Sequence, residues 1–64
     1  MVMDCVGTTI RTTSVRYAEK VVNTFDRYEV GIKFVFHNNK TTVIWYGHNR
    51  DKRNRDYNLL IKRM

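Results

Sequence analysis

Residues 30–47 read VGIKFVFHNNKTTVIWYG, and they decide the class of fold that this chain of 64 residues adopts. Over residues 30–36 an apolar side chain occupies every second position, which is the period of a strand with one buried face. Asn38 and Asn39 follow, and asparagine tolerates the positive φ angles of a tight turn. Residues 40–47 are again rich in β-branched and aromatic side chains. This stretch therefore predicts a β-hairpin.

The length of the turn decides how the two strands of this hairpin pair. A two-residue turn places Ile32 opposite Trp45, whereas a three-residue turn places Ile32 opposite Tyr46. The sequence leaves both registers open, and in both of them the second strand is apolar on both faces. A single helix covers only one face of a sheet. We expect the other face to be covered by the N-terminal strand, the chain ends or a second copy, or to stack bases of single-stranded nucleic acid.

The segment before the hairpin has a different periodicity. Its apolar residues recur at the three- and four-residue spacing of one helical face: Val15, Ala18, Val21, Val22 and Phe25. Charged and amide side chains occupy the other positions, as in a helix with one buried face. Thr12, Thr13 and Ser14 are candidate N-caps. The spacing predicts a helix over residues 14–28.

The two ends of the chain are less regular. Residues 2–10 alternate imperfectly and predict one strand, with a bulge at Gly7. Residues 48–56 contain no apolar side chain and predict an exposed loop. Residues 57–64 predict a third strand that folds back on residues 41–47, although their apolar spacing also fits a helix.

The expected fold is therefore a single α+β domain over residues 1–64. Its order is β-α-β-β-β, with an antiparallel sheet and one helix on one face. The alternative, with a helical C-terminal segment, is β-α-β-β-α.

Charge is distributed unevenly along the chain. Twelve Lys and Arg against six Asp and Glu give a formal net charge of +6. Residues 1–29 carry four of each sign, so the whole excess lies after residue 29. A basic half beside a neutral half is typical of proteins that turn one side toward a polyanion.

The candidate contacts are basic residues of the second half and the two aromatic residues at the end of the hairpin. Four cations lie within residues 50–55, and arginine forks suit bidentate contacts to phosphate. The predicted nucleic-acid-binding residues are Lys33, Lys40, Trp45, Tyr46, Arg50, Lys52, Arg53 and Arg55.

Catalysis finds little support in the sequence. The sole serine, Ser14, fits a helix cap better than a nucleophile. Cys5, His37 and His48 lack the spacing of metal ligands. We therefore predict a protein that is not an enzyme and holds no cofactor or metal. The enzyme alternative is a metal-free ribonuclease that uses His37 or His48 as general acid or base.

Cellular location and partners follow from the same composition. A single cysteine excludes an intramolecular disulfide and fits a reducing compartment. No apolar run approaches the roughly 18 residues of a membrane span, and the N-terminus lacks the features of a signal peptide. We expect a cytoplasmic homodimer that binds nucleic acid and no membrane. The alternative is a small inhibitor or adaptor whose basic face docks on an acidic partner protein.

Overall fold

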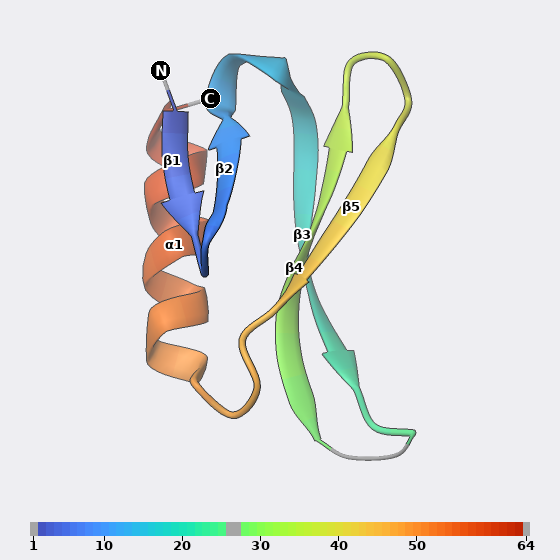
Figure 1. The fold of residues 1–64 in the computed structure, drawn as a ribbon, viewed down its shortest axis with the longest axis vertical. Coiled ribbons are helices and arrows are strands. Elements are labelled where there is room, and N and C mark those ends of the chain that lie inside the picture. The colour runs from blue at the N-terminus through green and yellow to red at the C-terminus, as the bar shows by residue number, and fades with distance from the viewer. Residues whose placement is uncertain (1, 26–27, 64) are drawn as a thin grey trace.

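A computed structural model describes residues 2–25 and 28–63. Within them, five strands and a short 3₁₀ turn precede one helix (Figure 1): β1 Val2–Cys5, β2 Thr8–Arg11, η1 Thr12–Ser14, β3 Val15–Asn23, β4 Glu29–Phe36, β5 Thr41–Trp45 and α1 Arg50–Arg63. β1 and β2 form an antiparallel hairpin, and β3, β4 and β5 form a second antiparallel sheet in that order. The α+β class is confirmed. The order is β-β-β-β-β-α, so the expected β-α-β-β-β order is wrong.

The helix predicted over residues 14–28 is wrong, because most of that segment is strand β3. β3 pairs with β4 along its whole length, and the register shifts at a bulge between Val15 and Tyr17. The bulge brings Val15 and Ala18 to the same face, although they are three residues apart, and a spacing of three is also the spacing of a helix. Residues 26 and 27, which the prediction also covered, lie outside the described residues.

The N-terminal segment forms two strands and not one. β1 and β2 pair from Cys5 opposite Thr8 outward, which leaves Val6 and Gly7 as a two-residue turn. Both turn residues have positive φ, 50° and 78°, as in the primed turns that fit the twist of a hairpin. Gly7 therefore sits in a tight turn and not in the expected bulge.

The hairpin predicted over residues 30–47 is confirmed as β4 and β5, but its register differs from both expected ones. Ile32 lies opposite Ile44, and the turn consists of residues 37–39. The Phe36 N–H donates to the Lys40 carbonyl at 2.9 Å, and Asn39 takes the positive φ of 68°. The three-residue turn begins one position earlier than expected because Asn39, at its end, supplies the left-handed residue.

The C-terminal segment is helical from Arg50 to Arg63, so the loop predicted over 48–56 is wrong from residue 50 onward, and the third strand predicted over 57–64 is wrong for residues 57–63. Residue 64 lies outside the described residues. The helical alternative is confirmed for residues 57–63. Asn49 caps the helix, because its Oδ1 accepts from the Lys52 N–H at 3.1 Å and its carbonyl accepts from the Arg53 N–H at 3.2 Å.

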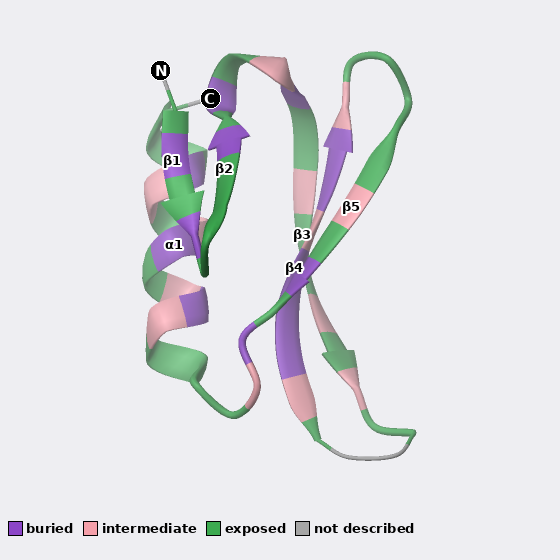
Figure 2. Cartoon of the chain, in the orientation of Figure 1, coloured by how far each residue is buried: buried purple, intermediate pink, exposed green. Residues whose placement is uncertain are grey.

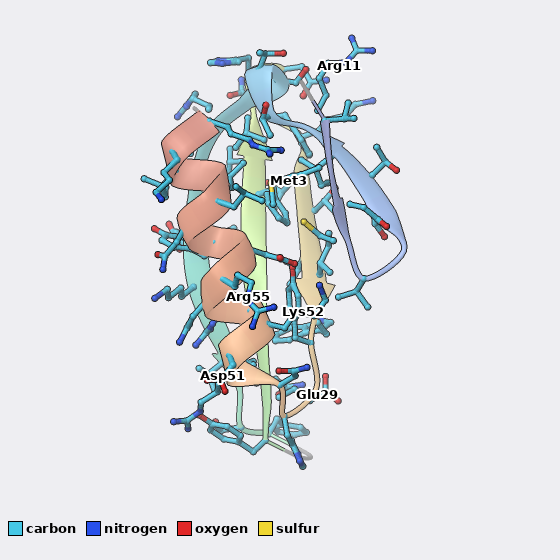
Figure 3. All side chains as sticks on the ribbon, turned by 90° about the vertical axis from the view of Figure 1, so that its left-hand side faces the viewer. Met3, Arg11, Glu29, Asp51, Lys52 and Arg55 are labelled. Carbon is cyan, nitrogen blue, oxygen red and sulfur yellow. The ribbon has the colours of Figure 1, made fainter. Side chains whose placement is uncertain are left out.

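The molecule has two layers. α1 and the β1–β2 hairpin lie side by side against one face of the three-stranded sheet (Figures 1 and 3). The core lies between these layers: Met3, Cys5, Ile10, Val15, Val30, Ile32, Phe34, Ile44, Tyr46 and Leu60. β4, in the middle of the sheet, is buried over most of its length, whereas β3 and β5 are largely exposed (Figure 2).

The opposite face of the sheet is covered by no element of the described chain. From the register, this outer face carries alternate residues of each strand: Tyr17, Glu19 and Val21 of β3, Gly31, Lys33 and Val35 of β4, and Thr41, Val43 and Trp45 of β5.

Candidate functional site

The structure divides the predicted binding residues between several places. Arg50, Lys52, Arg53 and Arg55 all lie on the first half of α1, and Figure 3 labels two of them there. Lys33 and Trp45 lie on the outer face of the sheet, and Lys40 ends the β4–β5 turn. Tyr46 lies in the core. The helical cations form one group, and the sheet separates them from Trp45.

Arg53 is a buried residue and takes no part in the helix surface. Its side chain is 8% exposed, and its Nη1 donates to the carbonyls of Gly31 at 3.2 Å and Val21 at 3.4 Å. These carbonyls belong to paired residues of β3 and β4, and the Arg53 Nε donates to the Asn54 Oδ1 at 2.8 Å. Arg53 therefore stabilises the packing of α1 against the sheet.

Asp56 is the second charged residue on the inner side of α1. It is 7% exposed, accepts a hydrogen bond from the Tyr46 hydroxyl at 2.8 Å and pairs with the Lys52 Nζ at 3.5 Å. Burial raises the pKa of Tyr46, and the hydrogen bond to Asp56 raises it further. Burial also raises the pKa of the Cys5 thiol, which lies beside Tyr46. Tyr46 therefore keeps its proton and acts as a donor to Asp56.

The inward position of Asp56 leaves the exposed side of α1 strongly positive. We call this surface the cationic side of α1; it consists of Arg50, Lys52, Arg55, Lys62 and Arg63. Asp51 is the one carboxylate among the described residues of this side. Asp56 still pairs with Lys52 at 3.5 Å, so the excess of this side comes from Arg50, Arg55, Lys62 and Arg63.

The five cations of this side differ in how far they are engaged within the chain. Arg50 lies over the Tyr28 ring at 5.0 Å and donates to its hydroxyl, and the Arg63 Nη1 donates to the Val2 carbonyl at 3.5 Å. Arg55 and Lys62 have no partner within residues 2–25 and 28–63. They lie seven residues apart, or about 10 Å along one side of the helix. Both are therefore available to an anionic ligand.

The outer face of the sheet has a different chemistry. Tyr17, Val43 and Trp45 are each about 40% exposed there. Trp45 leans over β4, because Gly31 has no side chain: a Cβ at that position would lie 2.7 Å from the Trp45 ring. Glu19 and Lys33 are cross-strand partners and balance each other, and the Arg16 guanidinium lies over the Tyr17 ring at 5.5 Å. Tyr17 was missed in the sequence because its segment was expected to be a helix.

The two histidines are not brought together. His37 belongs to the β4–β5 turn, and His48 follows β5 at the other end of the same hairpin, beside Tyr28. Five or more residues of strand separate them, which corresponds to roughly 17 Å or more. An open hollow of about 340 Å³ next to His37 is also lined by Thr13, Ser14, Phe36 and Asn38.

The described residues form neither a metal-binding cluster nor a helix able to span a membrane. Residues 2–25 and 28–63 contain no group of three or more His, Cys, Asp or Glu placed to hold a metal ion. α1, the helix of this part of the chain, is too short and too polar to cross a membrane.

Comparison with known proteins adds no family assignment. The chain matches no protein-family model, no curated protein and no solved structure at a significant level.

Proposed function

We propose that this chain is a small non-enzymatic protein that binds nucleic acid, with the cationic side of α1 against the phosphate backbone. The observation that supports this proposal is the exposed surface of α1, which carries five cations, of which Lys52 alone pairs with Asp56, and one carboxylate, Asp51. Such a surface gains affinity by releasing the counterions condensed on a polyanion.

The side chains around these cations favour a duplex as the ligand. Single strands are held by bases that stack on aromatic rings. The exposed ring that contacts the cationic side of α1 is Tyr28, and the Arg50 guanidinium already lies over it. Asn58, between Arg55 and Lys62, is exposed and offers both a donor and an acceptor to a base edge.

The shape of α1 also fits duplex DNA. Fourteen residues make a helix about 21 Å long. The major groove of B-DNA, about 12 Å wide, admits a helix, whereas the major groove of duplex RNA is too narrow to be read by side chains. We infer that the ligand is double-stranded DNA.

The experiment is a titration of a fluorescently labelled 20-base-pair duplex, followed by anisotropy at several salt concentrations. Three to five phosphate contacts predict a slope of roughly −3 to −4.5 in a plot of log affinity against log salt. The double variant Arg55→Glu/Lys62→Glu should weaken binding by at least tenfold at low salt. Its matched control is Arg16→Glu/Lys40→Glu, which makes the same charge change at the β4–β5 turn, where Arg16 donates to Asn39, and should stay within about threefold of the wild type.

Two results would contradict the proposal. Equal losses in both double variants would mean that net charge and not this surface determines binding. A wild-type protein that does not bind the duplex even at low salt would exclude the function and would favour an acidic protein as the partner.

A further inference from the structure

We propose that the outer face of the three-stranded sheet is the interface of a homodimer. Its two ends are apolar and its middle row holds the charged pair Glu19 and Lys33: at one end Val35, 7% exposed, lies beside Tyr17, and at the other end Trp45 lies beside Gly31 and Val21. Tyr and Trp are the residues most enriched at the centre of protein interfaces. No strand or helix of the described chain covers them, although the Arg16 guanidinium lies over the Tyr17 ring at 5.5 Å.

The distribution of charge over the surface indicates that the partner on the outer face is a second copy of this chain. The chain has a net charge of +6, so two copies repel each other over most of their surface. The outer face has the least excess charge, because Glu19 and Lys33 balance each other there and Arg16, over the Tyr17 ring, adds a single positive charge at one end. Two copies therefore approach with least repulsion through this face.

The pattern of the outer face is also complementary to itself. Consider a two-fold axis that runs parallel to the strands and lies above the outer face, over the line midway between β3 and β4. The outer faces of the two copies then pack against each other, and each β3 faces the β4 of the second copy. Because Glu19 and Lys33 are cross-strand partners, this axis places Glu19 of each copy opposite Lys33 of the other. Both charges are then paired across the interface.

The same axis accounts for the position of Trp45. Its ring leans over Gly31 of β4, and Gly31 is the cross-strand partner of Val21 in β3. The axis therefore sets Trp45 of one copy against Val21 of the other. Tyr17 is in turn opposite Val35, since these two residues are also cross-strand partners.

The size of the face sets the expected strength of the dimer. Three strands about 4.8 Å apart make a narrow face, at the low end of specific interfaces. A typical interface takes about 800 Å² from each partner, and the whole chain exposes 4408 Å². We expect a dimer that dissociates in the micromolar range.

The test is sedimentation equilibrium without nucleic acid. Protein concentration is varied from about 1 to 200 μM, because weak dimers with interfaces of this size form in that range. Wild-type protein should pass from monomer to dimer over this range. Glu19→Lys and Lys33→Glu should each weaken the dimer at least tenfold, and the charge swap Glu19→Lys/Lys33→Glu should restore it to within about threefold of the wild type. Asp51→Lys, on α1, makes the same charge change as Glu19→Lys and should dimerise like the wild type.

Several outcomes would overturn the proposal. The first is a wild-type protein that stays monomeric up to about 200 μM, where a weak interface of this size should form a dimer. The second is a loss of dimer affinity in Asp51→Lys as large as that in Glu19→Lys. The third is a charge-swap variant that dimerises no better than the two single variants. Circular dichroism shows which variants are folded. As a second measurement that needs no variant, iodide should quench Trp45 less at high protein concentration than at low concentration. Equal quenching at both would count against the interface.

Discussion

The cationic side of α1 and the outer face of the sheet lie on opposite sides of β3, β4 and β5, and they differ in the two properties that determine binding. The helix surface has charge and little apolar area, whereas the sheet face has apolar area and little net charge. Because positive charge and apolar area lie on opposite surfaces of this small domain, each surface can bind a different partner. In the proposed dimer the two helices point away from each other and would meet two separate duplexes.

The largest expected effect is on the free energy of unfolding, when the buried Arg53 of α1 is replaced and the result is compared with replacement of the exposed Arg55. Arg53→Met should lower the free energy of unfolding by about 1.5–3 kcal/mol, because hydrogen bonds from a charged donor to the Val21 and Gly31 carbonyls are lost. A urea titration measures this change. The affinity of the folded protein for DNA should change little.

Arg55→Met, two residues further along the helix, is the matched control. It should leave the urea midpoint unchanged and weaken DNA binding several-fold, because Arg55 is exposed and has no partner in the described chain. If Arg53→Met and Arg55→Met weakened DNA binding equally, the division of α1 into an inner and an outer side would be wrong.

The next largest effect is on how the free energy of unfolding changes with pH, and it depends on the residues packed against the inner side of α1. The folded protein holds the protons of Tyr46 and Cys5 more tightly than the unfolded chain does, because burial raises the pKa of both groups. Below about pH 8 both states are protonated, so this stabilisation is fully present. Above about pH 9 the unfolded chain loses these protons first, and the free energy of unfolding should fall as pH rises.

Urea titrations at pH 7, 9 and 10.5 measure this slope. Tyr46→Phe/Cys5→Ala should be less stable than the wild type at pH 7 and should show a shallower decline toward pH 10.5. Tyr28→Phe, which removes a hydroxyl at the surface, should keep the wild-type slope. A slope unchanged in the double variant would show that the cluster around Asp56 does not govern alkaline stability.

The smallest effect concerns the start of α1. Asn49→Ala removes the side chain that accepts from the Lys52 N–H, and loss of an N-cap costs about 1 kcal/mol. Asn58→Ala, in the exposed interior of the helix, is the comparison variant and should leave the urea midpoint unchanged or raise it slightly, because alanine has the higher helix propensity. A larger loss at Asn58 would mean that Asn49 is not the cap.

The parts of the fold that the sequence predicted are those that depend on local alternation. Residues 30–36 alternate cleanly, and β4 and β5 form the hairpin that this alternation indicates. β3 was missed because the bulge after Val15 produces a spacing of three between buried residues. A bulge depends on pairing with a distant strand, which one segment of sequence does not contain.

The candidate site was predicted in part for a similar reason. The sequence pointed to the cations of residues 50–55 but gave them a loop, because a helix is recognised by apolar residues on its inner side. Here Arg53 and Asp56 occupy inner positions and are satisfied by carbonyls of the sheet and by Tyr46. Those partners come from residues 10 to 32 positions away, beyond the reach of any local pattern.

The most direct test of the central claim, that the two surfaces act separately, is the emission of Trp45 during DNA binding. Trp45 is the chain's single tryptophan, and it lies on the outer face, across the sheet from α1. Protein held above the concentration at which it dimerises is titrated with duplex, and anisotropy of the labelled DNA reports binding. We predict that Trp45 emission stays constant until the protein is saturated with duplex. Quenching of Trp45 that follows the anisotropy curve would contradict the account, because DNA would then contact the outer face.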